Sequence, residues 1–525
     1  MNKNELEKSW LPEVEELNLR KRLAAQMGGE ENLARHRAAG RLNVRERIER
    51  LLDPGSFHET GAITGTPTFE DGRLVKLFPS NFILGTGRID RRRVVIGADD
   101  FTIRGGAADA AIGHKAAYAE KMALDLRLPM VRLVDGTGGG GSVKFLEQMD
   151  RTYVPYNPAM EVMAELLSTV PVAGAALGSV AGLGAARVVL SHFSVIPRKT
   201  AQLFVAGPPV VEPALGRKVG KEELGGSTIQ TGGFGAVDNE VDSEDAAFDQ
   251  IRRFLSYLPD SVYELPPVRE SADPVDRREE ELVRIIPRNK RRPYPVRRLL
   301  GLILDRESFF EIGARHGQSI VTGLARLSGR PVGVFAHDCN FFGGAITAQA
   351  ADKLTRFIDL CDTFHLPVVN FVDNPGFMIG GDAERQGTIR FGARYIFAVY
   401  QATIPWCSVI LRRVYGVAGA AHGNHSRLNL RYAWPSGEWG SLPLEGGVMA
   451  AYRRQIEAAE DPAALKHEIE ERLSQFTSPF LTAEKFGIEE IIDPRDTRPL
   501  LCEWIETAYR LLPSQLGPKK RGIRP

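Results

Sequence analysis

The feature that most constrains this chain is a long internal repeat. When the sequence is shifted against itself by 238 positions, residues 100–138 align with residues 338–376 without a gap, and 12 of 39 positions are identical. Ordinary residue frequencies would give about two or three identities. Both copies read as apolar strand, paired glycines, helix, second strand and aspartate, which is an α/β pattern. Two tandem copies of one α/β fold are the simplest explanation. The identical pairs include Asp100/Asp338, Gly105/Gly343, Gly106/Gly344, Lys115/Lys353 and Asp135/Asp373.

The length of the chain agrees with two large domains, and its balanced charge leaves almost no net charge on the protein. At about 150 residues per domain, 525 residues would make three or four domains, but the repeat favours two. The 67 basic and 66 acidic residues leave a formal charge of +1. Such a chain has no overall attraction for nucleic acid or for an anionic membrane, so we expect neither as a partner. Any anionic ligand must be held by local groups.

The cysteines and the N-terminus indicate a reducing, cytoplasmic location. All four cysteines lie in the second half without a CxxC pair, which excludes a zinc ribbon and argues against a disulfide framework, so we expect small buried side chains. The charged N-terminus contains no apolar segment, so no signal peptide is expected. Residues 170–186 carry no charge, but five are Gly or Pro. A buried strand, turn and helix start is therefore predicted there, not a membrane span.

The remaining pattern predicts two domains with a connector. Apolar residues recur every three or four positions between 13 and 52, which predicts helices. Their basic residues either meet phosphates or, more simply, form a solvated helical face. The first domain is predicted to span residues 1–262, a Pro- and charge-rich linker 263–298, and the second domain 299–525. Two helices near 461–474 and 500–512 are expected in a solvated tail. The basic residues in question are Arg20, Lys21, Arg22, Arg35, Arg37, Arg41, Arg45 and Arg47.

Within the repeat, the pattern predicts matching elements in the two halves. Strands are expected at 81–85, 94–98, 130–134 and 170–177 in the first half, with a helix at 110–126. The second half is expected to have strands at 332–336, 368–372 and 408–411, with a helix at 348–363. A run of four glycines, 138–141, follows the strand at 130–134; it is either a ligand-approaching turn or a flexible linker.

Each half also contains a turn of small residues directly after an apolar strand. The first is 178–186 and the second 414–421. A helix that begins there would present free backbone N–H groups to an anion or oxyanion, although tight helix packing would also explain small residues. Fixed N–H donors suit a reaction that places negative charge on a carbonyl oxygen. Two such turns imply two carbonyl-bearing reactants.

No catalytic set of side chains is visible. The chain lacks a GxSxG elbow, an HExxH motif and a Walker loop. His422 and His425 are spaced for a metal on a helix, but no third ligand is near in sequence, so no metal is expected. Lys115 and Lys353 are interpreted as structural or exposed lysines.

Several motifs resemble those of one family. They are 40–48 (GRLNVRERI), 52–57 (LDPGSF), 100–102 (DFT), 204–208 (FVAGP), 223–226 (ELGG), 373–377 (DNPGF), 412–416 (RRVYG) and 432–435 (YAWP). Together they look like the carboxyltransferase (β) subunits of biotin-dependent acyl-CoA carboxylases, of the propionyl-CoA and methylcrotonyl-CoA carboxylase type. The resemblance covers nearly the whole chain in the right order.

The resemblance implies an architecture and partners. It implies two tandem crotonase-like domains, an acyl-CoA side (1–262) and a biotin side (299–525). It also implies a homo-hexamer built as a dimer of trimers, with the site between the N-terminal domain of one chain and the C-terminal domain of another. The chain has no biotinylation motif and no ATP-binding region, so carboxybiotin would arrive on a biotin carboxylase or biotin carboxyl carrier partner.

The resemblance also assigns roles to the two turns. The N–H groups of Gly182 and Leu183 would hold the acyl-CoA thioester oxygen, and those of Val417 and Ala418 the ureido oxygen of biotin. Carboxybiotin would release CO2, the biotin anion would remove the α-proton, and the thioester enolate would attack CO2, with no protein base. Residues expected to bind substrate are Gly105, Gly106, Gly138, Gly139, Gly184, Gly343, Gly344, Tyr415, Gly416, Gly419 and Ala420.

Departures from the family pattern keep other functions open. Leu183 and Val417 each replace a family glycine. Gly184 is therefore an alternative donor in the first turn, and Gly419 and Ala420 are alternative donors in the second. Ala420 replaces an aspartate that bears on acyl selection, so the acyl group is not predicted. A decarboxylase subunit running the transfer in reverse, a stand-alone hydratase or isomerase, and a non-catalytic scaffold of the same fold are the alternatives.

Overall fold

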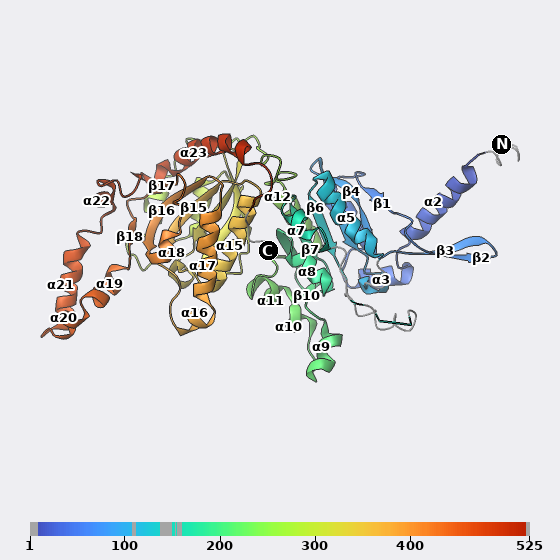
Figure 1. The fold of residues 1–525 in the computed structure, drawn as a ribbon, viewed down its shortest axis with the longest axis horizontal. Helices are drawn as coiled ribbons and strands as arrows, with labels where there is room; N and C mark the ends of the chain where they lie inside the picture. Colours follow the sequence, from blue (N-terminus) through green and yellow to red (C-terminus); the bar gives the residue numbers. More distant parts are fainter. Residues whose placement is uncertain (1–8, 108–111, 137–149, 153, 155–159, 521–525) are drawn as a thin grey trace. The chain divides into compact units, whose positions relative to one another are not determined.

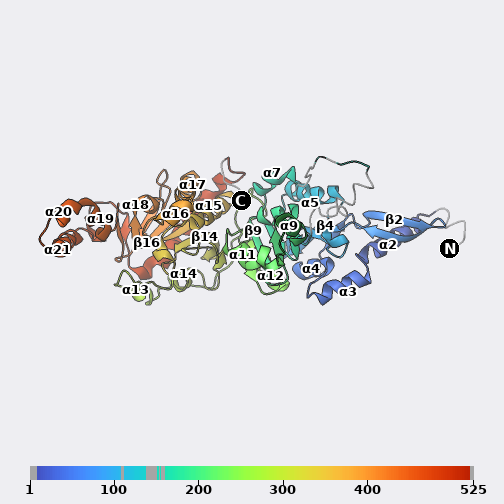
Figure 2. The ribbon, with the colours of Figure 1, turned by 90° about the horizontal axis from the view of Figure 1, so that it is seen from below.

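The structure, a computed structural model, is organised as two compact units. It describes residues 9–107, 112–136, 150–152, 154 and 160–520. The first unit extends to Ser256, and the second begins at Tyr257 (Figures 1 and 2). Each unit has its own sheet and its own buried core.

The first unit is built on a seven-stranded sheet within the described residues. Its first two pairings, β1 with β4 and β4 with β5, are antiparallel, and every later pairing is parallel. In spatial order the strands are β1 (His58–Thr60), β4 (Phe82–Ile89), β5 (Arg92–Asp99), β6 (Met130–Val134), β7 (Val172–Ala176), β9 (Phe193–Pro197) and β11 (Asn239–Val241). Separate two-stranded sheets pair β2 (Gly65–Glu70) with β3 (Arg73–Pro79) and β8 (Ser179–Ala181) with β10 (Gln202–Phe204).

Helices of the first unit lie mainly before and between these strands. Three of them, α2 to α4, occupy the stretch that the 13–52 periodicity predicts as helical. The helices are α2 (Leu11–Ala25), α3 (Glu30–Ala38), α4 (Val44–Leu51), α5 (Gly113–Leu126), α7 (Met163–Leu167), α8 (Leu183–Val189), α9 (Pro208–Leu215), α10 (Lys221–Gly225), α11 (Ser227–Gly232) and α12 (Glu244–Leu255), with the 3-10 turn η1 (Arg104–Gly106).

The second unit has an eight-stranded sheet within the described residues. Its path is β12 (Phe310–Ile312), β13 (Ile320–Leu327), β14 (Arg330–His337), β15 (Val368–Asn374), β16 (Trp406–Tyr415), β17 (Leu430–Ala433) and β19 (Glu490–Ile491), and β18 (Glu438–Gly440) pairs with β16. The helices and 3-10 turns are α13 (Leu282–Ile285), α14 (Val296–Ile303), η5 (Phe342–Gly344), α15 (Ala348–Thr363), α16 (Gly381–Arg385), α17 (Thr388–Gln401), α18 (Gly416–Ala420), α19 (Leu444–Ala451), α20 (Arg453–Glu457), α21 (Pro462–Ser474), α22 (Pro479–Ala483), η6 (Pro494–Asp496), α23 (Thr497–Leu511) and η7 (Leu512–Gln515).

The two sheets begin with the same pattern of pairings. In the second unit β12, β13 and β14 are antiparallel neighbours, and β15 and β16 follow in parallel, as β1, β4, β5, β6 and β7 do in the first unit. A 3-10 turn and a helix connect β5 to β6 and likewise β14 to β15. The repeat in the sequence thus corresponds to a repeat in topology.

The core of the second unit shows that the expected solvated tail is wrong for its last helix. Side chains on alternate residues of β16, Cys407, Val409 and Leu411, face a cluster that includes α14 and α23. Leu501 and Ile505 of α23 are fully buried in that cluster. Figure 2 shows α14 and α15 on opposite sides of the sheet. The apolar stripe of α23 therefore closes one face of the core.

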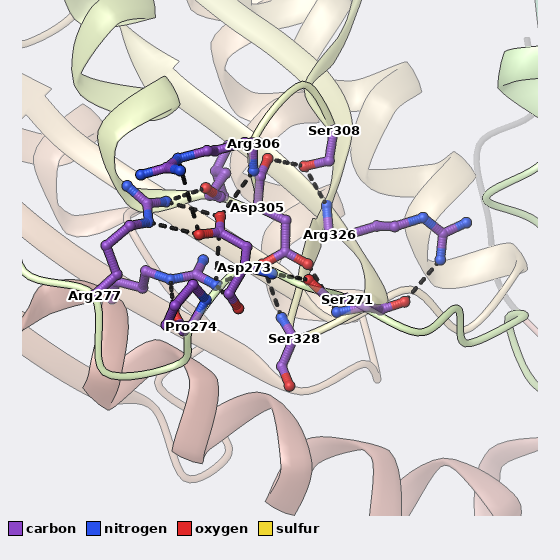
Figure 3. Close-up of polar contacts among 12 residues, drawn as sticks. Ser271, Asp273, Pro274, Arg277, Asp305, Arg306, Ser308, Arg326 and Ser328 are labelled. Carbon is purple, nitrogen blue, oxygen red and sulfur yellow. Dashed lines mark hydrogen bonds and ion pairs between the residues drawn. The ribbon is translucent and has the colours of Figure 1, made fainter.

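Residues 263–298, expected to be a linker, fall inside the second unit and are held there by buried arginines. The Arg277 guanidinium donates to the carbonyls of Leu302 and Leu304 at 2.8 and 2.9 Å and to the Asp273 carboxylate (Figure 3). Arg498 of α23 donates to the Pro274 carbonyl at 2.8 Å. Burial would raise the pKa of Asp273, but its hydrogen bonds and neighbouring arginines lower it overall, so the carboxylate stays charged. Some of the charged residues in this segment therefore anchor it, although most of them are exposed.

The uncharged stretch 170–186 has the structure that its small residues predict. It forms β7, β8 and the start of α8, and the strand residues of β7 are all buried. Within the part of the chain that the structure describes, no helix is long and apolar enough to cross a membrane.

Candidate functional site

The first turn joins β8 to α8 through Gly182. This residue has φ +60° and is the N-cap of α8, and a Cβ built on it would meet nothing within 4 Å. The Ala186 N–H donates to the Gly182 carbonyl at 3.1 Å, which closes the first helical turn. The N–H groups of Leu183 and Gly184, inside that turn, have no acceptor four residues back within the helix, and glycine has no side chain to cap them. Gly182 itself is exposed, and Leu183 and Gly184 are partly exposed.

A buried ion pair lies beneath this turn. The Asp135 carboxylate, after β6, accepts from Arg47 Nη1 at 2.8 Å, and Arg47 Nη2 donates to the Leu177 carbonyl at 3.0 Å. Glu244 of α12 accepts from Arg47 Nε at 2.6 Å. Both partners of the Arg47–Asp135 pair have side chains 1% exposed or less. Arg47 therefore fixes the chain immediately before Gly178, where the turn begins.

The second turn joins β16 to α18 through Gly416. Its φ is +62°, and α18 runs from Gly416 to Ala420. Val417 is 68% exposed, whereas Ala418 is 1% exposed and Gly419 is buried. The N–H groups of the first helical turn again lack acceptors within the helix, and Tyr415, the N-cap, makes no side-chain cap. The start of this helix is therefore open to solvent at Val417.

A second ion pair lies beneath this turn. Asp373, at the carboxyl end of β15, accepts from Arg413 Nε at 2.6 Å through Oδ1 and from Arg412 Nη2 at 2.9 Å through Oδ2. The Tyr294 hydroxyl also donates to Oδ2, at 3.2 Å. Burial alone would raise the pKa of Asp373, but the hydrogen bonds and charges of Arg413 and Arg412 lower it below its ordinary value. The carboxylate is therefore ionised at neutral pH.

The two units build this ion pair differently. Gly178 stands four residues before Gly182, and Arg412 stands four residues before Gly416. A Cβ on Gly178 would lie 1.9 Å from Asp135 Oδ1, so the carboxylate occupies the space that a side chain would need. In the first unit the cation consequently comes from helix α4, whereas in the second unit it comes from the strand itself.

The repeated glycine pairs lie against the repeated aspartates. Gly106 and Gly344 have φ of +66° and +87°, and a Cβ on them would lie 2.5 Å from the Asp135 carbonyl oxygen and 2.9 Å from that of Asp373. Only glycine permits both the positive φ and this approach. The structure thus brings Gly105 and Gly106, and Gly343 and Gly344, to the end of the central strand of their own units. Gly138 and Gly139 lie outside the described residues.

Lys115 and Lys353 are structural, as expected. Lys115 of α5 donates to the Gly61 carbonyl at 3.2 Å, and Lys353 of α15 donates to the carbonyls of Gly313 and His316 at 2.9 and 2.7 Å. Gly61 and Gly313 directly follow the equivalent strands β1 and β12. Each lysine therefore fastens the connecting helix to the first strand of its sheet.

Sequence reasoning missed the buried cations. The helical face around Arg47 was expected to be solvated, and for Arg47 this is wrong because its partners come from distant segments. Arg412 and Arg413 belong to a recognised motif, but no role was predicted for them. The signal that could have found them is electrostatic: a repeated aspartate after a buried strand needs a nearby cation.

The two histidines do not form a metal site with other residues. Within the described residues there is no group of three or more His, Cys, Asp or Glu side chains that could hold a metal ion. His422 is buried, and its Nδ1 lies 2.7 Å from the Gly419 carbonyl oxygen, to which it can donate. Burial lowers the pKa of His422 to about 4, so the ring is neutral and braces the second turn.

Comparison with known proteins gives consistent matches along the chain. The family model of the carboxyl transferase domain matches residues 35–523. A propionyl-CoA carboxylase carboxyltransferase subunit from Haloferax mediterranei is 33% identical over 488 residues, which are 92% of this chain and 94% of the relative. A methylmalonyl-CoA decarboxylase subunit alpha from Veillonella parvula is 29% identical over 503 residues, 95% of this chain and 96% of the relative.

A solved structure matches over slightly more of the chain. It is the transcarboxylase 12S crystal structure, described as a hexamer assembly with methylmalonyl-coenzyme A and methylmalonic acid bound. The match has a TM-score of 0.85 and 29% identity, and it covers 98% of both chains.

Proposed function

This chain belongs to the carboxyl transferase domain family, and from that premise we propose that it is the carboxyltransferase subunit of a biotin-dependent acyl-CoA carboxylase. The observation that carries the proposal is the pair of turns, one per unit, in which a left-handed glycine and a helix start leave backbone N–H groups open above a buried ion pair. Two fixed donor sets of this kind suit two reactants that each present a carbonyl oxygen.

The first turn takes the acyl-CoA. The N–H groups of Gly182 and Leu183, with Gly184 adjoining, would donate to the thioester oxygen. As the α-carbon loses its proton, negative charge develops on that oxygen, and donors that are already oriented stabilise it without reorganisation. The Arg47–Asp135 pair supports this by fixing the chain before Gly178. Gly105 and Gly106 border the same strand end and would lie beside the bound substrate.

The second turn takes biotin carried by a partner chain. The N–H groups of Val417 and Ala418 would donate to the ureido oxygen, with Tyr415, Gly416, Gly419, Ala420, Gly343 and Gly344 around it. Bound carboxybiotin supplies the carboxyl group as CO2 and, once that has left, a base for the α-proton of the acyl-CoA. The protein would orient both reactants and exclude water, and needs no acidic or basic side chain of its own.

The assembly proposed follows the family. We propose two tandem crotonase-like domains, a homo-hexamer built as a dimer of trimers, and a biotin carboxylase or biotin carboxyl carrier chain as partner. The support is the matching order of sheet pairings in the two units and the hexamer described for transcarboxylase 12S. Carboxylation in the cell, on the α-carbon or on the vinylogous γ-carbon, is the direction we favour because a 33% identical relative is a carboxylase subunit.

A second candidate function is the reverse transfer, as in a biotin-dependent acyl-CoA decarboxylase. The observation in its favour is the 29% identity to a methylmalonyl-CoA decarboxylase subunit over nearly the whole chain. The same turns would serve both directions, because the enolate and the ureido oxygen occur in both. Copurification with a membrane-embedded partner would support this candidate.

The test is carboxyl transfer from malonyl-CoA or methylmalonyl-CoA to free biotin by the purified chain, with enoyl-CoA hydration measured in parallel. Leu183→Pro removes one N–H at the first helical position, where proline is tolerated, and Leu183→Ala keeps it. We expect the proline variant to lose about 100- to 1,000-fold in turnover and the alanine variant to remain near wild type. Equal turnover in both variants would contradict the role of the first turn. Biotin-independent hydration would contradict the reaction itself.

A further inference from the structure

Arg413 joins three segments at the second turn. Its Nε and its backbone N–H donate to Asp373 Oδ1 at 2.6 and 3.2 Å, and its Nη2 donates to the Gly343 carbonyl at 2.6 Å. Asp373 ends β15, Gly343 lies in η5, and Arg413 itself precedes Gly416 by three residues. One guanidinium therefore connects the glycine pair of the repeat, the repeated aspartate and the strand that leads into α18.

The neighbouring Arg412 has a different role. It holds the other oxygen of Asp373, and its Nη1 donates to the carbonyls of Lys290 and Arg292, at 3.2 and 3.1 Å, in the segment before α14. With Tyr294 on the same oxygen, the buried charge of Asp373 is already paired without Arg413. What Arg413 adds is a donor to the first oxygen of Asp373 and, from the same guanidinium, the bond to Gly343.

The Arg413 guanidinium lies beside both glycines of the pair. A Cβ on Gly343 would lie 3.9 Å from Arg413 Nη1, and a Cβ on Gly344 would lie 3.8 Å from Nη2. The guanidinium lies beside both residues and donates to a carboxylate through Nε and to a carbonyl through Nη2. A lysine ammonium is a single point and cannot hold both acceptors in the same geometry.

We propose that Arg413 is a positioning residue for the biotin half of the reaction. It holds η5 and the entry to α18 at a fixed separation, so that the N–H groups of Val417 and Ala418 are oriented before biotin binds. This inference rests on the proposed function, because it assigns the second turn to the ureido oxygen. It predicts that loss of Arg413 affects the biotin side and leaves acyl-CoA binding intact.

The test compares Arg413→Lys with Arg431→Lys in the full-length protein. Arg431 is a matched control: it lies on β17 of the same sheet, makes two 2.6 Å bonds to Glu489 and contacts a glycine carbonyl, that of Gly487, at 3.5 Å. Their side chains are 17% and 21% exposed. The assay is transfer from malonyl-CoA to free biotin, with KM determined separately for each reactant.

We expect Arg413→Lys to lower kcat/KM for biotin about 10- to 100-fold while KM for malonyl-CoA changes less than twofold. Arg431→Lys should match wild type in both. Methylguanidinium added to Arg413→Ala should restore part of the biotin turnover without changing KM for malonyl-CoA.

Three results would overturn the proposal. One is wild-type biotin kinetics in Arg413→Lys. Another is an equal rise of both KM values with a fall in thermal midpoint, which would make Arg413 only structural. If Arg413→Lys does not fold, Arg413→Gln replaces it, and wild-type biotin kinetics there overturn the assignment equally. Absence of transfer in the wild-type chain would instead overturn the proposed function, and this inference with it.

Discussion

At the scale of single residues, Gly178 determines whether the first turn can form. The Asp135 carboxylate fills the position that a Cβ on residue 178 would occupy. Because the backbone fixes a Cβ in place, no side-chain rotation could relieve the clash. Asp135 cannot withdraw either, since it is bonded to buried Arg47. The neighbouring Gly182 has open space instead, so its requirement is only the positive φ.

We predict that Gly178→Ala lowers the free energy of unfolding by about 1–3 kcal/mol or more, because a Cβ would be forced against a buried carboxylate. Urea denaturation measures this. Gly301→Ala is the control: Gly301 lies in α14 with nothing within 4 Å of its Cβ position, so alanine should be neutral or stabilise by up to about 1 kcal/mol. Equal stabilities of the two variants would contradict the packing at Asp135.

At the scale of elements, the repeat is held together by the same lysine in both halves. Lys353 joins α15 to the segment after β12 through two carbonyls, and Lys115 joins α5 to the segment after β1 through one. Burial lowers the pKa of Lys115, as expected for an ammonium removed from water.

We predict that Lys353→Met destabilises the chain by about 1–3 kcal/mol, because two carbonyls lose a charged donor, and Lys115→Met by less, because only one does. Both are measured by urea denaturation against Lys466→Met. Lys466 makes one partly exposed 3.5 Å ion pair on α21, which contributes little. A loss in Lys466→Met as large as in Lys353→Met would refute the interpretation.

Sequence patterns predict the long helices and the buried strands of this fold well. The helix at 348–363 and the strand at 130–134 occur at the predicted limits, because Thr347 caps the helix and apolar residues fill the strand. The β2–β3 hairpin was not predicted, since its side chains are mostly exposed and show no buried alternation. The burial of α23 could not be predicted because periodicity shows that a helix has an apolar face, not what covers it.

At the scale of the whole molecule, the family and the locations of the two turns could be predicted, whereas the groups that hold the turns could not. The resemblance read from eight short motifs is confirmed by the family match. Arg47 and its partners Asp135 and Glu244 are 88 and 197 residues apart, so no local pattern connects them. The roles of Gly182, Leu183, Val417 and Ala418 stay predictions.

Buried neutral histidines make the stability of the second unit depend on pH. Burial lowers the pKa of His337, His365 and His422 to about 4 each. The unfolded chain binds protons on them below about pH 6.5, and the folded chain does not until about pH 4. Each histidine therefore lowers the free energy of unfolding as pH falls between these values, by about 1.4 kcal/mol per pH unit at most.

We predict that His422→Gln flattens this dependence. The glutamine amide can still donate to the Gly419 carbonyl, but it does not titrate. The difference in free energy of unfolding between variant and wild type should shift in favour of the variant from pH 6.5 to 4.5, as measured by urea titrations at each pH. A difference that is constant with pH would show that His422 is not held neutral. Burial raises the pKa of Asp99 and Asp100, so these two residues increase the free energy of unfolding as pH falls. Variant and wild type both contain them, so their contribution cancels in the difference.

The different origins of the two buried cations imply an order of folding. In the second unit, Asp373 and Arg413 are 40 residues apart on neighbouring strands, so their contact closes a short loop. In the first unit, Arg47 must meet Leu177 across 130 residues and Glu244 across 197. Contacts of large sequence separation cost more loop-closure entropy and form later. During synthesis, α4 leaves the ribosome long before its acidic partner on α12 exists, so the first turn can be completed only when nearly all of its unit has been made.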